Sequence, residues 1–387
     1  MKDKVGKFVA SIVELFNREV KASGQKDIYK NDSDNLYPNR VELVERNSVT
    51  AFAASNKLKS FIVGQGFVDT SLNEQIFNRQ KRLRGYDFLQ LLAHSLKTHR
   101  GAFVHVNYDM DGEVNYLDVL DYKKCRISKE DSTDHPGKIY YHDWPGEKKF
   151  DRGDTKCRWF YPFNKDIDII NDQRTKDAKD RKDESVEGLI RSYRGQVFFL
   201  SLDPTEVYPY AWVHPAYNDA DNEYRISLYR NTNLRSGFLN KTMIIPNGLD
   251  EETQEEFDEA IRGWLGAENS SSVFVFKPKE DVAELDNLIK TIELKGTYDS
   301  KRFEKDEESI ANNIRKSYLS IPKILIDPED SFFGSSGEAF KEAIRYYNKE
   351  TLFIRESVAY MMDNFYEGDF TIKELGENEL RTRTITD

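Results

Sequence analysis

Residues 310–365 constrain the fold most, because helix-forming and helix-breaking residues follow one another there in a fixed order. A first helix must end near Pro322, which has no backbone N–H to continue it. A second helix is predicted after Ser335, which makes a capping box with Glu338. No Gly or Pro occurs between Glu338 and Gly368, and a stripe with alternating four- and three-residue spacing runs through Phe340, Ile344, Tyr347, Thr351, Ile354, Val358, Met361 and Phe365.

This spacing predicts one long, uninterrupted helix. It would have about 30 residues and a length of about 45 Å. Helices of globular domains are usually much shorter. Such a helix must cross a whole domain or pack against copies of itself.

The segment between the two predicted helices is both acidic and aromatic. It contains three carboxylates, a serine, two phenylalanines and a glycine: Asp327, Glu329, Asp330, Ser331, Phe332, Phe333 and Gly334. Carboxylates are poorly suited to a buried core, because they lose their hydration there. Taken alone, the acids fit a solvated turn between two helices best.

The composition indicates a large folded protein with much polar surface. A chain of 387 residues is long enough for about two to three structural units. Its 13% aromatic residues argue against disorder, whereas 32% charged residues suggest an elongated body or polar subunit interfaces. The net charge of −11 argues against a protein that grips nucleic acid through a basic surface, but not against one past which DNA slides.

The sequence predicts neither export nor a membrane span. Cys125 and Cys157 give no disulfide framework and indicate a reducing compartment. Residues 1–16 have an amphipathic helical pattern, which Lys7 and Glu14 make unlike a signal peptide. No run of 18 apolar residues occurs, so we expect a soluble chain.

Helices and strands are interspersed along the chain, which predicts an α+β fold. Helical patterns cover residues 41–63, 86–97, 218–240, 252–265 and 300–320. The turn Asp109–Gly112 predicts a hairpin, and strands are expected at 102–108, 114–120, 138–142, 158–161, 197–200, 243–245 and 273–276. Residues 165–187 mix both charge signs and fit a solvated loop or a surface helix.

Two motifs that resemble ligand loops are explained better by local structure. Gly64 and Gly66 lack the third glycine and the lysine of a phosphate loop, so they predict a helix end followed by a strand. The acids in the Asp109–Glu113 segment suggest calcium, but Val114 and Leu120 occupy the positions where such a loop needs Gly and Glu. A hairpin turn is the preferred interpretation.

We predict no catalytic residue, metal site or cofactor. His94, His99 and His105 lack the one-turn spacing of a helical metal pair, and no Cys or Glu completes a set with them. No Gly-x-Ser-x-Gly elbow supports a serine nucleophile. The remaining acids cluster at helix starts, where capping explains them.

Two passages together resemble the portal proteins of tailed bacteriophages, the head–tail connectors. The first, residues 86–120, is similar to that family's helix, RGxAxxxV strand and DGxVxxLxxLD return strand. The second, residues 230–339, follows the order of the family's stem, clip, second stem helix, tunnel loop and post-loop helix. Each motif alone is weak, but their order over residues 36–367 is fairly specific.

The resemblance implies an α+β portal fold with an α/β wing, a helical stem and a small α/β clip. Carried over by position, it divides the chain into an N-terminal helix and arm (1–35), wing (36–217), stem helix 1 (218–240), clip (241–280), strand or loop and stem helix 2 (281–321), tunnel loop (322–337), long helix (338–367) and short polar tail (368–387). The charged run at 165–187 resembles an insertion, and the tail leaves little for a crown.

The resemblance also implies which residues meet DNA and partners. The tunnel-loop residues from Asp327 to Gly334 would face the channel, where acids repel the phosphate backbone. Phe332 and Phe333 would pack against neighbouring subunits or touch the DNA. Stem helix 2 would contribute Lys301, Arg302, Lys305, Arg315 and Lys316, and the clip would dock motor and neck proteins through Asn247, Glu252, Glu255, Glu256 and Trp264.

A chain of this family would be a non-enzymatic subunit of a ring, commonly a dodecamer, at a capsid vertex of the virion, after assembly in the host cytoplasm. Its partners would be copies of itself, the terminase large subunit, capsid and scaffolding proteins, a neck or tail adaptor, and double-stranded DNA that passes without sequence specificity; no membrane is implied. Two alternatives stay open. One is another ring-forming head–tail adaptor, and the other is a phage-encoded, metal-dependent nuclease or hydrolase.

Overall fold

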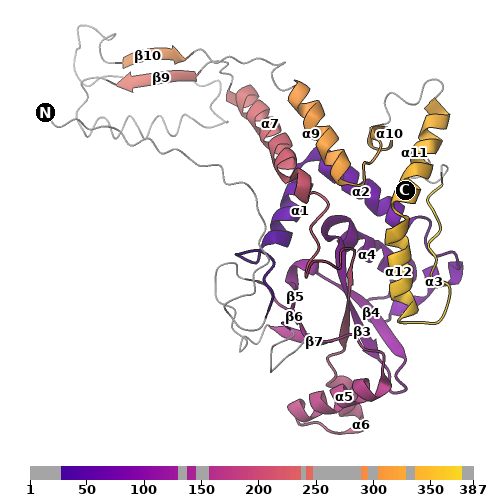
Figure 1. The fold of residues 1–387 in the computed structure, drawn as a ribbon. Coiled ribbons are helices and arrows are strands. Elements are labelled where there is room, and N and C mark those ends of the chain that lie inside the picture. The colour runs from indigo at the N-terminus through magenta and orange to yellow at the C-terminus, as the bar shows by residue number, and fades with distance from the viewer. Residues whose placement is uncertain are drawn as a thin grey trace. The chain divides into compact units, whose positions relative to one another are not determined.

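The computed structural model describes residues 28–129, 137–144, 157–236, 241–246, 289–294, 304–327 and 336–376. They form a mixed helix-and-sheet protein (Figure 1) with two compact units, one of Met1–Ala220 with Asn313–Asp387 and one of Asp221–Asn312. The helices predicted at 1–16 and 252–265, and the strand predicted at 273–276, lie outside the described residues.

A six-stranded sheet is the centre of the first unit. Its order is β4-β3-β8-β7-β6-β5, and only β7 and β8 run parallel to each other. The predicted hairpin of β3 and β4 is confirmed, and Gly112 adopts φ +87° in its turn, a conformation that glycine adopts without strain. The strands are β3 Gly101–Tyr108, β4 Val114–Leu120, β5 Cys125–Ile127, β6 Ile139–Tyr141, β7 Arg158–Pro162 and β8 Gln196–Ser201.

Side chains alternate between the two faces of this sheet, as strand geometry requires. On one face, Phe103 and Phe199 stack with ring centroids 4.3 Å apart. That face shares a buried cluster with Tyr122, Cys125, Ile139, Phe160, Val197 and Tyr208. On the other face, Phe198 meets Phe365 edge to face at 5.6 Å, which joins the sheet to the end of α12, Leu352–Asp363.

The helical pattern predicted as one helix over residues 41–63 is two helices, so that prediction is wrong. Helix α1 spans Tyr37–Asn47 and α2 spans Val49–Val63. Between them Ser48 is extended, and its hydroxyl accepts a hydrogen bond from the backbone N–H of Ala51 at 3.1 Å. A serine in that role caps a new helix, so the chain can change direction there. Both helices pack against α4, Gly85–His99.

The long helix predicted behind the loop is also two helices, α11 Ser336–Glu350 and α12. The interruption is at Thr351, whose ψ is −1°. Its hydroxyl donates to the carbonyl of Tyr347 at 2.8 Å, and Arg355 donates to that of Asn348 at 2.8 Å. These side chains satisfy carbonyl groups at the break, so the helix can be interrupted without leaving them unpaired.

The predicted apolar stripe is nevertheless confirmed along both helices. From Ile344 to Phe365 each of its members is buried, and Phe340 is half-buried. Even Thr351, the polar member, has no exposed surface. The stripe therefore faces the interior of the first unit.

The C-terminal segment is more integrated than a short polar tail. Phe370, Ile372 and Leu375 are buried, and Ile372 forms a β-bridge with Phe67. Gly64, at φ +54°, ends α2 as predicted, and a Cβ there would lie 2.0 Å from the carbonyl oxygen of Lys373. The glycine is needed because the tail passes so close to the end of α2.

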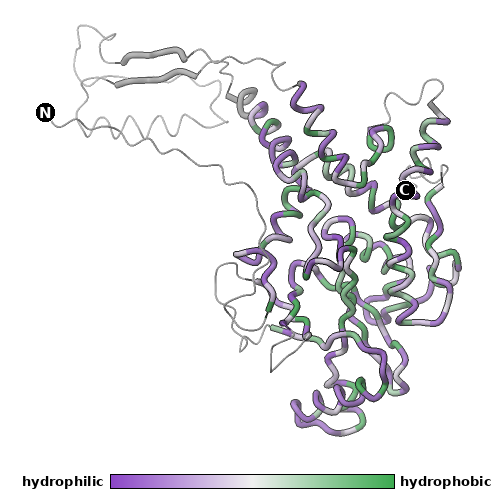
Figure 2. Tube along the Cα trace, in the orientation of Figure 1, coloured by the Kyte–Doolittle hydropathy of each residue, from purple (hydrophilic) through white to green (hydrophobic). Residues whose placement is uncertain are grey.

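The charged run at 165–187 forms mostly surface helix, as one of its two interpretations predicted. Helix α5 spans Ile167–Arg181 and α6 spans Val186–Arg191, and together they connect the parallel strands β7 and β8. Figure 2 shows α5 as mainly hydrophilic, in contrast to the strands. One side of α5 is buried nevertheless, and it includes Asp177. The Asp177 carboxylate accepts hydrogen bonds from Tyr161 Oη at 3.1 Å and from the backbone N–H of Arg194 at 2.9 Å.

The second unit contains most of α7, Tyr217–Ser236, and of α9, Glu304–Ser317, with the antiparallel pair β9 Lys241–Pro246 and β10 Ile289–Leu294. Arg230 of α7 and Glu307 of α9 form an ion pair at 2.7 Å. The smaller elements of the first unit are α3 Thr70–Glu74, β1 Ile76–Asn78, β2 Leu83–Arg84, η1 Tyr122–Lys124, η2 His214–Ala216 and α10 Lys323–Ile326. Within the described ranges, no helix is long and apolar enough to cross a membrane.

Candidate functional site

The candidate site is the acidic loop and the structure that holds its two ends. The chain enters the loop from α10, and Asp327, the first predicted loop residue, is exposed at the end of that helix. It leaves the loop into α11, which packs beside α10 (Figure 1). The other predicted loop residues, Glu329, Asp330, Ser331, Phe332, Phe333 and Gly334, lie outside the described part of the chain.

Tyr318 joins the two sides of the loop. Its ring is fully buried, and its hydroxyl donates to Oε2 of Glu45 in α1 at 3.1 Å. The hydroxyl of Tyr347 in α11 donates to the backbone carbonyl of Tyr318 at 3.0 Å. Burial and the adjacent Glu45 carboxylate raise the pKa of Tyr318 well above its ordinary value, so the phenol stays a donor. Both ends of the loop are thereby tied to the same core.

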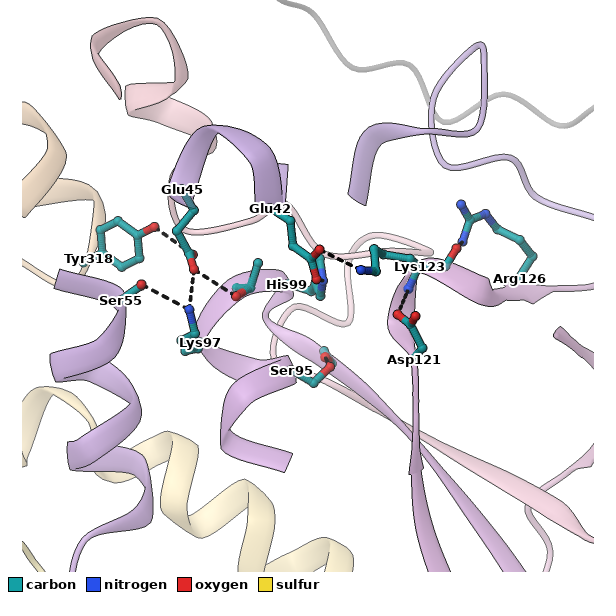
Figure 3. A network of polar contacts seen from close by, with 12 residues as sticks. Glu42, Glu45, Ser55, Ser95, Lys97, His99, Asp121, Lys123, Arg126 and Tyr318 are labelled. Carbon is teal, nitrogen blue, oxygen red and sulfur yellow. Dashed lines mark hydrogen bonds and ion pairs between the residues drawn. The ribbon is translucent and has the colours of Figure 1, made fainter. Parts of the chain in front are cut away.

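Glu45 belongs to a buried ion pair beneath this junction (Figure 3). The ammonium of Lys97 in α4 bonds to Oε1 of Glu45, and both side chains are almost fully buried. Lys97 also donates to Ser55 Oγ at 3.2 Å, and Thr98 donates to Glu45 Oε1 at 3.2 Å. A buried charge pair is tolerated only when its remaining hydrogen-bonding groups find partners, and here they do.

The chain turns sharply between α9 and α10. Leu319 and Ser320 both have positive φ, 56° and 51°. The backbone N–H of Ile321 donates to the carbonyl of Arg315 at 3.1 Å, which closes the end of α9. Ile321 and Leu325 are buried just beyond the turn, so the entry into the loop is fixed by packing as well.

A second polar cluster lies beside the first, at the same C-terminal end of α4 (Figure 3). Lys123 donates to Glu42 at 2.7 Å, and His99 Nε2 lies 3.9 Å from the same carboxylate, a distance too long for a hydrogen bond. Burial opposes ionisation of Glu42, but these two partners outweigh it and lower its pKa to about 2. The cluster fixes α1 to the segment between β4 and β5.

The three histidines do not form a site. The rings of His99 and Tyr122 stack with centroids 4.3 Å apart. In β3, His105 Nε2 lies 2.9 Å from the backbone carbonyl oxygen of Arg194. His94 is exposed on α4. Oδ1 of Asp109 accepts from the backbone N–H groups of Asp111 and Glu113, both at 3.0 Å, as the hairpin interpretation predicts. In the described residues no group of His, Cys, Asp and Glu could hold a metal ion.

The predicted stem and clip residues are only partly within the described ranges. Lys305, Arg315 and Lys316 lie on α9, where Lys305 and Lys316 are exposed. Outside the described residues lie Lys301, Arg302, Asn247, Glu252, Glu255, Glu256 and Trp264. The strand pair β9–β10 connects the start of the predicted clip to residues 289–294, beyond its predicted end at residue 280.

Sequence reasoning missed the residues that hold the loop. Glu45 follows Val41 and Val44 on the buried side of α1, and Lys97 follows Leu96 on that of α4. A charged residue at the buried positions of a helix is unusual unless it is paired, and this pattern could have identified both. Not every apolar residue of these helical patterns is buried, since Phe52 and Leu91 are exposed.

Comparison with known proteins gives similarity among solved structures alone. No family model and no curated protein matches the chain. It is similar to a chain of the virion of a native gene transfer agent particle, with 12% identity, a TM-score of 0.46, and 86% of this chain and 83% of that chain covered. A chain in the neck of that native particle, computed with C12 symmetry, has 13% identity, a TM-score of 0.45, and coverage of 87% and 83%.

An HK97-family phage portal protein from Corynebacterium diphtheriae is similar at 10% identity and a TM-score of 0.41, with 84% of this chain and 89% of that chain covered. At these identities and TM-scores, the function of the chain has to be argued from its own residues.

Proposed function

We propose that this chain is a portal subunit, which forms a ring at a capsid vertex of a phage-like virion and lets double-stranded DNA pass during packaging and ejection. The proposal rests on the order of the sequence motifs and on one structural observation. Tyr318 and Tyr347, on either side of the acidic loop, are hydrogen-bonded to each other and, through Glu45, to the core. The residues before and after the loop are therefore held on one core.

The charge of the loop suits a channel better than a binding site. Every lysine or arginine docked on phosphate adds affinity and so slows a sliding duplex. Carboxylates repeated around a ring repel the backbone instead, and their fields add. In this proposal Asp327, Glu329 and Asp330 keep DNA away from the wall, while Phe332 and Phe333 pack against neighbouring loops or touch the duplex.

The remaining parts follow from the same proposal. Helices α7 and α9 are the stem, and the segment between them is the clip that docks the terminase large subunit and later a neck or tail adaptor. The first unit is the wing, which meets capsid and scaffolding proteins. The subunit performs no catalysis, because a separate ATPase motor supplies the energy for packaging.

Reversal of the loop charge tests this role. Replacing Asp327, Glu329 and Asp330 together with lysine should slow or stall DNA packaging in a reconstituted packaging reaction, because the loop would then attract phosphate. The matched control replaces Asp172, Glu184 and Glu187 with lysine, which changes the net charge equally on the exposed surface of α5, α6 and the turn between them. Unchanged packaging by the loop variant would refute the proposed role of the acids.

A further inference from the structure

A second stripe of aromatic side chains runs along the outside of α11 and α12. Tyr346, Phe353 and Tyr360 follow one another at seven-residue intervals, and all three are exposed, Tyr360 by 67%. Leu352 beside them is exposed as well. The buried stripe already anchors both helices to the core, whereas the outer stripe leaves much of its apolar surface exposed. Exposed apolar groups gathered on one face are typical of an interaction surface.

The exposed charges along α12 are acidic, whereas Arg345 and Lys349 are exposed beside Tyr346 in α11. Glu356, Asp363 and Glu367 are exposed, and Glu350 is half-buried at the end of α11. Arg355 is the single basic residue between positions 350 and 367, and it is buried against backbone carbonyls. We call the stripe with these acids the α12 face.

A second exposed apolar face lies at the junction of α1 and α2. Leu43 near the end of α1 and Val49 and Phe52 at the start of α2 are exposed, Val49 by 77%. Exposed Arg46 lies between them in the sequence. Residues 46–68 contain three basic residues, Arg46, Lys57 and Lys59, and no acidic one. We call this the α1–α2 face.

The two faces belong to different edges of one helical layer in the first unit. Helix α1 packs against α2 and α4, and α12 packs against α2. Figure 1 shows the indigo α1 and the yellow α12 on opposite sides of α4. The part of the first face that lies on α12 is acidic and the second face is basic, and both are apolar at their centre. Two different faces that fit each other produce head-to-tail contacts, which give a ring when the rotation between neighbouring copies closes.

We propose that the α12 face of one copy docks on the α1–α2 face of the next copy. The inference rests on the proposed portal function and adds to it the surfaces that build the ring. Aromatic side chains at the centre of an interface carry most of its binding energy. Phe353, Tyr360 and Phe52 are therefore the residues whose loss weakens assembly most, and the opposite charges around them set the orientation of the two copies.

Two variants of the full chain, each with one face disabled, test the proposal by mass photometry. Phe353→Asp with Tyr360→Asp disables the α12 face, and Val49→Asp with Phe52→Asp disables the α1–α2 face. Each variant should raise the concentration needed for assembly at least about tenfold, because a charge is inserted at the centre of an apolar contact. The replaced side chains are exposed, so circular dichroism and the unfolding temperature should stay close to those of the wild type.

A mixture of the two variants distinguishes a head-to-tail contact from other contacts. Each variant keeps the face that the other lacks, so equimolar mixing should give dimers and nothing larger. The matched control is Val186→Asp on α6, a residue exposed by 66% outside both faces, and it should assemble like the wild type.

Each contrary outcome identifies what has failed. If the wild type forms rings and either variant assembles like it, or if the mixture stays monomeric, the proposed contact is wrong and the portal function stands. A wild-type chain that is monomeric at every concentration refutes the proposed contact and the ring together.

Discussion

At the scale of single residues, the first unit depends on charged side chains that are buried together with their partners. Glu45 and Lys97 form an ion pair that also receives Tyr318, the residue that begins the approach to the loop. Burying two charges costs hydration, and their mutual attraction compensates only while both are present. Loss of one partner is therefore more harmful here than at the surface.

Lys97→Met should lower the free energy of unfolding by about 3–5 kcal/mol, because Glu45 stays buried without its counter-ion. Adding Glu45→Gln should recover part of the loss, because the buried charge is removed and the amide oxygen can still accept from one of the two donors, Tyr318 or Thr98. The control, Lys81→Met, removes the ion pair with Asp118, in which Lys81 is 60% exposed, and should cost about 1 kcal/mol or less. Urea unfolding of the wild type and of the three variants measures these differences. Equal losses of stability in Lys97→Met and Lys81→Met would contradict the role of the buried pair.

Glu42 makes the stability of the fold depend on pH. Its pKa is lowered in the folded chain from 4.5 to about 2, so its stabilising effect is complete above pH 4.5 and is lost as the pH falls towards 2. Glu42→Gln should therefore lose about 1–2 kcal/mol less stability than the wild type between pH 5 and pH 2, after allowance for its partial exposure. Urea unfolding across that range provides the measurement, and parallel pH profiles of the two proteins would count against this effect.

At the scale of helices and strands, the sequence predicts local structure better than breaks and long-range pairing. The β3–β4 hairpin and α4 follow from a turn and from a helical pattern that lie within the segments themselves. The break at Thr351 requires Arg355 to reach the carbonyls of Asn348 and Phe61, and that contact exists only after α2 has packed against α12. The buried apolar stripe along α11 and α12 is predictable, because it depends only on the spacing of residues in the sequence.

The order of the strands in the sheet is another long-range feature that the sequence does not predict. Residues 197–200 are predicted as a strand, but nothing local indicates that β8 lies between β3 and β7. That arrangement depends on α5 and α6, which carry the chain across to a parallel neighbour. Likewise the Tyr347–Tyr318–Glu45 connection beside the predicted loop joins residues far apart in the sequence, so no local pattern indicates it.

Gly64→Ala tests how tightly the C-terminal segment is joined to α2. The new Cβ would meet the carbonyl of Lys373 at 2.0 Å, and the backbone has φ +54°, so the free energy of unfolding should fall by more than about 1 kcal/mol. Limited proteolysis should also cut after residue 367 sooner than in the wild type. Gly337→Ala is the matched control, because nothing lies within 4 Å of its added Cβ in α11. That variant should be unchanged or more stable by up to about 1 kcal/mol; similar behaviour of the two glycine variants would refute the proposed contact.

At the scale of the whole molecule, the chain combines a negative net charge with a low fraction of hydrophobic residues. With a net charge of −11 and 38% hydrophobic residues, it is unsuited to hold DNA and suited to repel it. Its mixed helix-and-sheet first unit supports a loop at fixed ends, and its helices expose two complementary faces. These properties are those that a channel built from many copies requires.

Electron microscopy of the purified full chain shows directly whether its copies assemble into a closed ring. Images of the wild type at concentrations above its assembly threshold should show closed rings with an opening along the axis. The same preparation should leave double-stranded DNA intact when a divalent metal ion is added. Monomers that cleave DNA in the presence of the metal would contradict the portal proposal and support the nuclease alternative.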